Sequence, residues 1–206
     1  MEPILFVVTG PSGAGKGSVM RRLLESAPHL KKVVTFTTRA PRAGEEDGFD
    51  YRFIGEDVFL QKVQTGEIFE YEQVYQDHYY GSPRDLFEAD FDGLIELDYK
   101  GYQKYRARHG RVVSIFLLPP DLEELKRRIV RRSEVENLDA RLRNAVEQLS
   151  HADEYDYVVK NDNLEACTAA VAELVEVERL RRQGQHDLQV IMRAVARDAA
   201  GREPAR

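Results

Sequence analysis

The sequence has one cysteine, no tryptophan and no long hydrophobic run. Cys167 has no second cysteine with which to form an intramolecular disulfide, and such usage favours a reducing compartment. The longest early apolar run, residues 4–8, is far shorter than a membrane span or the core of a signal peptide. We therefore expect a cytoplasmic protein with no membrane partner.

An excess of positive charge is also missing. The 30 lysine and arginine residues are outnumbered by 36 aspartate and glutamate residues, giving a formal net charge of −6. General nucleic-acid binders need the opposite sign, so we expect no nucleic-acid partner, and any bound anion must be held locally. With 14 glycines, 8 prolines and no fixed repeat among 206 residues, collagen-like and low-complexity architectures are excluded. The length suits one compact body with small inserts.

What the sequence contains instead is an alternation of strands and helices. Apolar, β-branched runs, typical of strands buried on both faces, occur at residues 4–9, 33–37, 94–98, 112–118 and 156–159. Helical stretches that separate the later runs occur at residues 99–109, 121–132, 138–151 and 164–182. This order predicts an α/β fold, in which a parallel sheet is flanked by helices.

Two segments depart from that alternation. Residues 40–90 consist of short aromatic pieces broken by glycines, and we interpret them as a small inserted substrate-binding lobe. Residues 185–206 follow Gly184, and their apolar residues at helical spacing are Leu188, Ile191, Met192 and Val195. We expect one short amphipathic helix there, docked on the body or on a second subunit, and then a flexible end. The protein would accordingly be a monomer or a homo-oligomer.

Residues 10–18 read GPSGAGKGS and lie between an apolar strand and an amphipathic helix, the context that a phosphate-loop motif requires. Glycines let consecutive backbone N–H groups turn toward phosphate oxygens, and the helix N-terminus adds partial positive charge. The lysine would reach the β- and γ-phosphates. The motif predicts that a nucleoside triphosphate is held by Gly10, Pro11, Ser12, Gly13, Ala14, Gly15, Lys16, Gly17 and Ser18. The alternative is a tight glycine turn with an exposed lysine.

A pair of carboxylates ends the apolar run at residues 94–98. Glu96 and Asp98 stand two residues apart, so on a strand they would face the same side at the carboxyl edge of the sheet, where α/β proteins bind ligands. They are candidates for contact with an acceptor nucleotide and, with Ser18, for holding Mg²⁺ through water. The alternative is a solvated strand end.

Two arginines and two tyrosines suggest a site for a phosphate monoester. Arg39 and Arg42 stand three residues apart across a proline, and Tyr51 and Tyr80 follow. The planar fork of arginine suits a phosphate monoester, and tyrosine hydroxyls can donate to its remaining oxygens. Paired arginines on a solvated surface are the alternative.

In combination, these motifs closely resemble those of the guanylate kinase family. The segments that carry the resemblance, in order, are GPSGAGKG, TTRAPRAGE, DGFDYRF, IFEY, YYGS, LIELDYKG and VVKND. They cover residues 4 to about 182, and TTRAPRAGE and YYGS are far more specific than the phosphate loop. The resemblance implies a P-loop NTPase fold with an inserted mixed α/β lobe and a helical lid. It also implies direct in-line transfer of the γ-phosphoryl group of ATP to GMP, and to dGMP, with Mg²⁺.

The resemblance divides the chain and assigns its residues. A guanylate kinase-like domain would span residues 1–184, with a core at about 1–36, 92–120 and 152–184, a GMP-binding lobe at about 37–91 and a lid at about 121–151. The implied catalytic residues are Lys16, Arg39, Arg128, Arg132 and Arg141. The implied GMP-binding residues are Thr35, Arg39, Arg42, Tyr51, Glu70, Tyr80, Ser82, Glu96 and Asp98. Asn161 would join the phosphate loop in binding ATP.

Guanine recognition by Glu70 has a physical basis. Guanine presents N1–H and N2–H₂ side by side, so one carboxylate can accept two hydrogen bonds, and the hydroxyls of Thr35 and Ser82 can complete the edge. Adenine has a lone pair at N1, and a buried polar site rejects such a mismatch by roughly 10⁴-fold in favourable cases. Two other readings stay open: a P-loop kinase with another small phosphorylated acceptor, and a non-catalytic guanylate kinase-like scaffold module.

Overall fold

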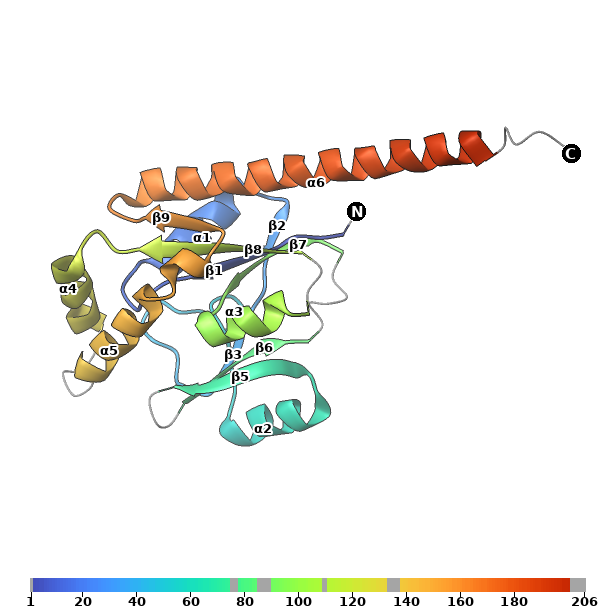
Figure 1. Ribbon diagram of the computed structural model, residues 1–206. Helices are drawn as coiled ribbons and strands as arrows, with labels where there is room; N and C mark the ends of the chain where they lie inside the picture. The colour runs from blue at the N-terminus through green and yellow to red at the C-terminus, as the bar shows by residue number, and fades with distance from the viewer. Residues whose placement is uncertain (1, 75–77, 85–89, 109–110, 133–137, 201–206) are drawn as a thin grey trace, which may run out of the picture.

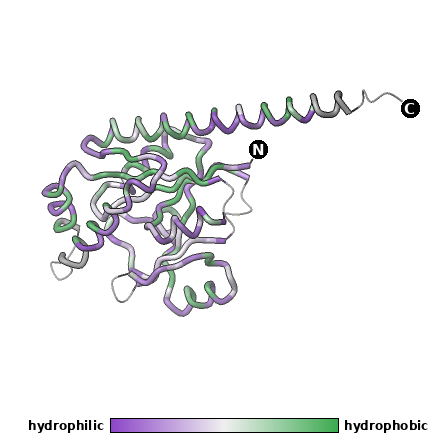
Figure 2. The backbone as a smooth tube through the Cα atoms, viewed as in Figure 1, coloured by the Kyte–Doolittle hydropathy of each residue, from purple (hydrophilic) through white to green (hydrophobic). Residues whose placement is uncertain are grey.

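The computed structural model describes residues 2–74, 78–84, 90–108, 111–132 and 138–200, with the backbone alone described for residues 74, 131, 132, 138–141 and 195–200. Its larger part is a five-stranded parallel sheet with the strand order β2-β7-β1-β8-β9 (Figure 1). The strands are β1 (Leu5–Thr9), β2 (Leu30–Lys32), β7 (Asp92–Glu96), β8 (Val112–Leu118) and β9 (Tyr157–Lys160). Hydrophobic residues concentrate in this sheet (Figure 2).

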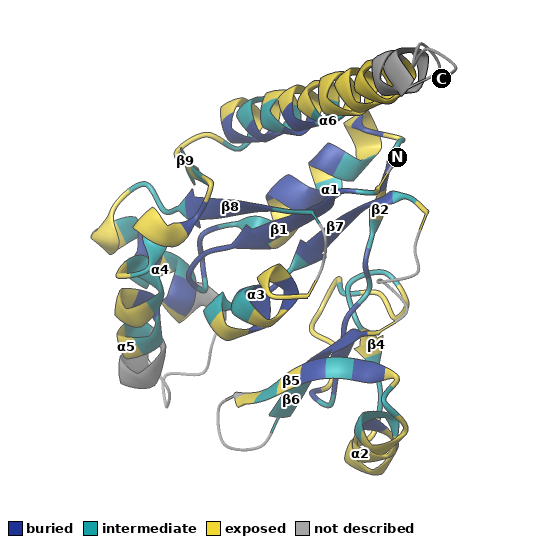
Figure 3. Cartoon of the chain, turned by 45° about the vertical axis from the view of Figure 1, so that its right-hand side comes forward, coloured by how far each residue is buried: buried dark blue, intermediate teal, exposed yellow. Residues whose placement is uncertain are grey.

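Helices cover both faces of the parallel sheet because its central strands are apolar at successive positions. The covering helices are α1 (Lys16–Ser26), α3 (Tyr99–Arg106) and α6 (Leu164–Ala200). On one face, Val19 of α1 and Val171 of α6 belong to the same buried cluster as Phe6. On the other face, Tyr102 of α3 belongs to a cluster with Phe116. The expected α/β fold of the P-loop NTPase type is confirmed (Figure 3).

The inserted lobe has its own four-stranded mixed sheet, with the order β4-β3-β6-β5. Its elements are β3 (Phe36–Thr37), β4 (Arg52–Phe53), α2 (Glu56–Thr65), β5 (Ile68–Val74) and β6 (His78–Pro83). β3 pairs in parallel with β4 and antiparallel with β6. Phe36, Phe59 and Ile68 form a small core that is separate from the core of the parallel sheet.

Two further helices and a short 3-10 turn connect β8 to β9. They are α4 (Leu122–Arg132), α5 (Leu138–Leu149) and the 3-10 turn at Ala152–Glu154. Leu125 and Ile129 of α4 pack with Ala145 of α5. This pair lies beside the carboxyl edge of the parallel sheet (Figure 1). It occupies the part of the chain, residues 121–132 and 138–151, for which the sequence predicted two helices.

The predicted strand at residues 33–37 is confirmed only at its end, since residues 36–37 form β3 and residues 33–35 are not a strand. β2 ends at Lys32, and β3 begins only at Phe36. The N–H of Val33 still donates to the carbonyl oxygen of Leu94 at 2.8 Å, after which the chain crosses to the small sheet and Phe36 pairs with Gly81. A crossover buried at both ends has the same apolar pattern as a buried strand, so periodicity alone does not separate the two.

The C-terminal segment also differs from the expected separate short helix. α6 continues through Gly184 and extends past the sheet as a single rod (Figure 1). A glycine inside a helix costs only about 1 kcal/mol relative to alanine, and helix-forming arginine and glutamine residues flank this one. Leu188, Ile191 and Met192 are 57%, 60% and 61% exposed, so they do not pack on the chain's own body. Among the described residues, no helix is both long and apolar enough to cross a membrane.

Ending the chain after Gly184 is therefore expected to leave its own folding unchanged. Truncation of exposed residues shifts stability by about 0.5 kcal/mol or less, which corresponds to a change in Tm of roughly 2 °C. Thermal melting and light scattering of the full and truncated chains test this. A larger fall in Tm together with a smaller mass would show that these residues pack on a second subunit, the other outcome that the sequence predicted.

A buried carboxylate ties α6 to the sheet. Asp92, 6% exposed at the start of β7, accepts a hydrogen bond from the N–H of Ile4 at 2.9 Å. It also accepts hydrogen bonds from Arg179 and Arg182 of α6. Burial alone would raise the pKa of Asp92, but the hydrogen bonds from Arg182 and Ile4 outweigh it, so the pKa lies below its ordinary value.

Asp92→Ala is expected to lower the free energy of unfolding by about 3 kcal/mol, because it leaves the guanidinium of Arg182 without its buried partner. Since the pKa of Asp92 is lower in the folded state, its contribution is present above the unfolded-state pKa of about 3.9 and is lost as the pH falls through the folded-state pKa. Urea unfolding at neutral and acid pH measures the difference. Asp187→Ala, at an exposed position of α6, is the matched control, and equal midpoints for the two variants would contradict the expectation.

Candidate active site

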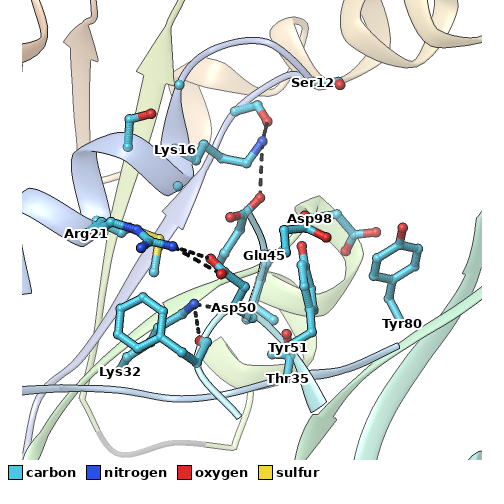
Figure 4. Close-up of a pocket in the computed structure, with 18 of the residues that line it drawn as sticks. Ser12, Lys16, Arg21, Lys32, Thr35, Glu45, Asp50, Tyr51, Tyr80 and Asp98 are labelled. Carbon is cyan, nitrogen blue, oxygen red and sulfur yellow. Dashed lines mark hydrogen bonds and ion pairs between the residues drawn. The ribbon is translucent and has the colours of Figure 1, made fainter. Parts of the chain in front are cut away.

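A cavity of about 1070 Å³ opens between the carboxyl edge of the parallel sheet and the small lobe. Lys16 comes to it from the phosphate loop, whereas Thr35, Tyr51 and Tyr80 come from the small lobe and from its connection to the core (Figure 4). Both groups of predicted residues therefore border one space. The predicted site residues that line it are Gly10, Ser12, Gly13, Gly15, Lys16, Gly17, Ser18, Thr35, Arg39, Arg42, Tyr51, Glu70, Tyr80, Ser82, Glu96 and Asp98.

The phosphate loop needs glycine for conformation and for close packing. Gly10 and Gly15 have φ angles of 144° and 91°, which favour glycine. A Cβ atom on Gly10 would lie 2.5 Å from the carbonyl oxygen of Leu117, and one on Gly15 would lie 2.4 Å from Nδ2 of Asn161. Larger residues would thus push the loop away from β8 and from Asn161. The loop follows β1 and leads directly into α1, as the motif predicted.

Lys16 turns back over its own loop. Its Nζ donates to the carbonyl oxygens of Gly10 and Pro11 at 2.6 and 3.3 Å. The same atom lies 3.4 Å from Oε1 of Glu96 at the end of β7. The ammonium group therefore stands between the phosphate loop and the neighbouring strand, at the position where a bound triphosphate would place its β- and γ-phosphates.

Glu96 and Asp98 do not project from one strand as expected. β7 ends at Glu96, and Asp98 is instead the N-cap of α3, with Oδ1 accepting from the N–H of Gly101 at 2.8 Å. Glu96 faces Lys16, whereas Asp98 lies near Glu70: burial raises the pKa of Glu70, and the charge of Asp98 adds to that rise. The helix begins here because aspartate accepts hydrogen bonds from the first turn well. Both carboxylates still line the cavity.

Arg39 is held by a partner that the sequence analysis did not single out. Two guanidinium nitrogens of Arg39 donate to the carboxylate of Glu45 at 2.6 and 2.7 Å, and its Nε lies 3.1 Å from the hydroxyl of Tyr80. Glu45 also accepts from the N–H of Arg42 at 2.8 Å. Burial alone would raise the pKa of Glu45, but its hydrogen bonds with Arg39 and Arg42 lower it overall. The glutamate of the TTRAPRAGE segment was the signal available in the sequence.

Tyr51 and Arg42 complete this side of the cavity. The guanidinium carbon of Arg39 lies 5.1 Å from the centre of the Tyr51 ring, and the rings of Tyr51 and Tyr80 meet edge to face at 5.9 Å. Burial, with the nearby charge of Glu96, raises the pKa of Tyr51, so its hydroxyl stays a neutral donor. Arg42 is exposed at the rim. The arrangement offers two guanidinium groups and two phenols to an anion.

The predicted guanine-binding residues meet on the other side of the cavity. Glu70 is 6% exposed, and its Oε1 accepts a hydrogen bond from the hydroxyl of Ser82 at 2.7 Å. Lys104 of α3 places its Nζ 3.8 Å from Oε2 of Glu70. The hydroxyl-bearing Thr35 is buried and lines the same space. This set of groups can accept hydrogen bonds from a base edge that carries two adjacent donors.

A second cavity of about 290 Å³ adjoins the phosphate loop, and it is lined in part by Ser18, Arg128 and Asn161. Nδ2 of Asn161 donates to the carbonyl oxygen of Ala14 at 2.7 Å. Arg128 donates to Glu124 at 2.7 Å and to the carbonyl oxygen of Gly13 at 3.3 Å. The side chains of Arg132 and Arg141, both predicted to be catalytic, lie outside the described residues.

Comparisons with known proteins show which family the chain resembles. The family model described as guanylate kinase matches residues 2–178. Guanylate kinases of Rhodopseudomonas palustris (strain HaA2) and Ruegeria pomeroyi are 37% and 40% identical to this chain over 202 and 196 residues, covering 95% and 90% of it and 91% of each relative. The crystal structure of guanylate kinase from Anaplasma phagocytophilum matches with a TM-score of 0.70 at 33% identity, covering 86% of each chain.

Proposed function

The chain belongs to the guanylate kinase family, and from that premise we propose how its residues divide the work of moving the γ-phosphoryl group of ATP to GMP. The observation that supports the division is the single cavity that Lys16 borders from one lobe and Arg39 and Glu70 border from the other. In this proposal the phosphate loop holds the donor, and the small lobe holds the acceptor.

On the donor side, the backbone N–H groups of the phosphate loop bind the phosphates of ATP, and Asn161 and Arg128 border the cavity beside the loop. Lys16 lies where its ammonium group can stabilise the negative charge that spreads over the transferred phosphoryl group. Arg132 and Arg141 join from the lid when it closes, which also excludes water that would otherwise compete with GMP as the acceptor.

On the acceptor side, Arg39, Arg42, Tyr51 and Tyr80 bind the phosphate of GMP. Glu70 accepts from N1–H and N2–H₂ of guanine, with Ser82 and Thr35 completing the edge and Asp98 beside them. We propose that dGMP is accepted as well, as the resemblance to the family implied.

The transfer itself needs no covalent intermediate on the enzyme. An acceptor oxygen can approach the γ-phosphorus in line, and catalysis then rests on positioning and charge stabilisation. Ser18, Glu96 and Asp98 line the same cavity as Lys16 and offer oxygen atoms, the ligands that Mg²⁺ prefers. We propose that they hold the ion through water, where it would neutralise charge on the β- and γ-phosphates of ATP. Trapping a phosphorylated enzyme would contradict direct transfer.

A coupled ADP-release assay with GMP, dGMP, AMP, UMP and CMP as acceptors tests the proposal. Rapid ADP release with the two guanine nucleotides alone is the expected result. Comparable turnover with AMP would favour the reading of a P-loop kinase with another acceptor. The absence of ADP release with every one of these acceptors would favour the scaffold reading, which the intact loop at Gly10, Gly15 and Lys16 opposes.

The proposal keeps the remaining expectations. The substrates ATP and GMP are the partners, and the net charge of −6 disfavours nucleic acid and anionic membrane surfaces. A cytoplasmic location is supported by the single, buried and unpaired Cys167. A catalytic domain at residues 1–184, with the lobe and lid bounds stated above, places every assigned residue before the exposed end of α6. Participation of that end in a homo-oligomer stays a prediction.

Acidification is expected to weaken GMP binding at a higher pH than an ordinary glutamate would. Burial raises the pKa of Glu70, and the charges of Asp98 and Glu72 add to the rise, whereas the hydrogen bond from Ser82 and the ammonium of Lys104 oppose it. Glu70 must be ionised to accept two hydrogen bonds, so the KM for GMP should rise as the pH falls through this pKa.

Lys104→Gln removes the nearby positive charge and so raises the pKa of Glu70 further. The KM for GMP should therefore begin to rise at a higher pH in this variant than in the parent enzyme. The ratio of the KM of the variant to that of the parent is the quantity to follow, because protonation of GMP itself, near a pKa of about 6, cancels in it. Lys62→Gln, on the outside of the small lobe, is the control. A ratio that stays constant with pH would contradict the expectation.

A further inference from the structure

A group of four residues joins the core to the small lobe at the wall of the cavity, and none of them has a role in the proposal above. Arg21 lies on α1, which begins at Lys16, and Lys32 ends β2 (Figure 4). Phe49 and Asp50 precede Tyr51 in the segment that leads to β4. All four line the cavity. They are called the anchor here.

Three kinds of contact hold the anchor together. One guanidinium nitrogen of Arg21 lies 3.2 and 3.1 Å from the two carboxylate oxygens of Asp50. Nζ of Lys32 donates to the backbone carbonyl oxygens of Phe49 and Asp50. The Phe49 ring contacts both cations, with its centre 4.9 Å from the guanidinium carbon of Arg21 and 4.8 Å from Nζ of Lys32. Two core cations therefore hold two consecutive residues of the small lobe.

The anchored residues also organise the acceptor side of the cavity. Asp50 accepts from the N–H of Glu46 at 2.9 Å and donates its own N–H to the carbonyl oxygen of Glu46 at 2.9 Å. The preceding residue, Glu45, is the one that holds Arg39. Tyr51 follows Asp50 directly. A displacement of Asp50 would consequently move both Tyr51 and the partner of Arg39.

We propose that Arg21 and Lys32 are positioning residues that fix the acceptor-phosphate groups relative to the phosphate loop. The inference rests on the proposed function of Arg39 and Tyr51. Arg21 stands five residues after Lys16 on the same helix, about 7.5 Å along its axis, so one rigid element carries both the donor-side lysine and the contact to Asp50. In-line transfer is sensitive to such placement, because an error of about 1 Å can cost roughly 10²-fold in rate.

The anchor is built for placement more than for stability. The side chain of Arg21 is 42% exposed and that of Asp50 20% exposed, and an ion pair at a solvent edge contributes about 1 kcal/mol or less. Burial lowers the pKa of Lys32, although the charge of Asp50 opposes this. Keeping Lys32 charged at this position therefore costs desolvation free energy. Loss of one anchor residue should consequently change kinetics while leaving the fold intact.

Arg21→Ala is the first test, in the full-length protein. The KM for GMP should rise about tenfold and kcat should fall, with the KM for ATP unchanged and Tm within roughly 2 °C. Arg21→Lys should restore part of the loss because it keeps the charge. Arg22→Ala is the matched control: Arg22 is the next residue of α1, is 48% exposed, and pairs with Glu165 of α6 instead of the small lobe. It should leave both KM values unchanged.

Asp50→Asn keeps the size of the side chain and an acceptor for the N–H of Glu46, but it removes the charge that Arg21 contacts. It should raise the KM for GMP as Arg21→Ala does, and the double variant should be no worse than the worse single one. Additive losses, or equal increases in both KM values, would overturn the inference.

Arg39→Ala, measured in parallel, separates the two ideas. If Arg39→Ala leaves the KM for GMP unchanged, the acceptor site itself is misassigned. If Arg39→Ala raises that KM and Arg21→Ala does not, the acceptor site stands and the anchor inference alone is wrong. A fall in Tm for Arg21→Ala with unchanged kinetics would assign the contact to stability and would likewise overturn it.

Discussion

Lys16→Ala is expected to reduce kcat by roughly 10²–10³-fold, as removal of one preorganised charge from a transition state does in other enzymes. The physical reason is the position of Nζ between the phosphate loop and Glu96, from which it can reach the phosphoryl group as negative charge spreads over it. Single-turnover measurement of ADP formation with saturating ATP and GMP gives the chemical step directly.

Tm is the control for Lys16→Ala, because Nζ also donates to the carbonyl oxygens of Gly10 and Pro11 and its loss could loosen the loop. An unchanged Tm with the lowered kcat assigns the effect to catalysis. Turnover within a few-fold of the parent enzyme would remove Lys16 from the catalytic residues.

Glu70→Gln is expected to lower the preference for GMP over AMP, expressed as a ratio of kcat/KM values, by about 10²-fold or more out of the roughly 10⁴-fold that a buried polar site can supply. The glutamine amide can accept one hydrogen bond from guanine, but it places N–H donors against the second donor of the base. The same amide can donate to N1 of adenine and accept from its N6 amino group. GMP should therefore become a poorer acceptor and AMP a better one.

The matched control for Glu70→Gln is Glu67→Gln. Glu67 lies just before β5 in the small lobe and pairs with Lys62 on the outside of the lobe. The coupled assay with both acceptors gives the two ratios. An unchanged preference in Glu70→Gln, or an equal change in Glu67→Gln, would place guanine recognition on other residues.

The phosphate loop and the parallel sheet could be predicted because their signals are local. A glycine-rich turn between an apolar strand and an amphipathic helix can be recognised within about 25 consecutive residues. Likewise, β8 lies at residues 112–118, as the apolar run indicated. The crossover at residues 33–35 could not be distinguished from a strand, because its position between two sheets gives it the same apolar pattern as a buried strand. Burial depends on the whole fold. An apolar composition indicates that a segment is buried, but it does not indicate whether that segment is a strand or a connection.

The contacts between distant charged residues were also beyond prediction. The sequence predicted Arg39 to be a phosphate ligand, but its bidentate contact with Glu45 depends on how the intervening turn is closed. Arg21 and Asp50 are 29 residues apart and belong to different lobes, so no periodicity links them. Asp98 was expected on a strand and begins a helix instead, because the strand ends two residues earlier. Pair contacts of this kind depend on the topology of the fold, which local sequence patterns do not determine.

Because Arg39 contacts Glu45, phosphate binding at the proposed acceptor site would require exchange for a carboxylate. A guanidinium group whose two terminal nitrogens already bind a carboxylate attracts free anions only weakly, and an incoming phosphate must take the place of Glu45 or share the fork with it. In the proposed site, inorganic phosphate would contact Arg42, Tyr51 and Tyr80 as a nucleotide does, but it gains no contact at the base pocket to offset that exchange. A nucleotide does, because its base reaches Glu70 and Ser82 at the same time. The same arginine that we propose to bind the substrate phosphate would thus also discriminate against the abundant small anions of the cell.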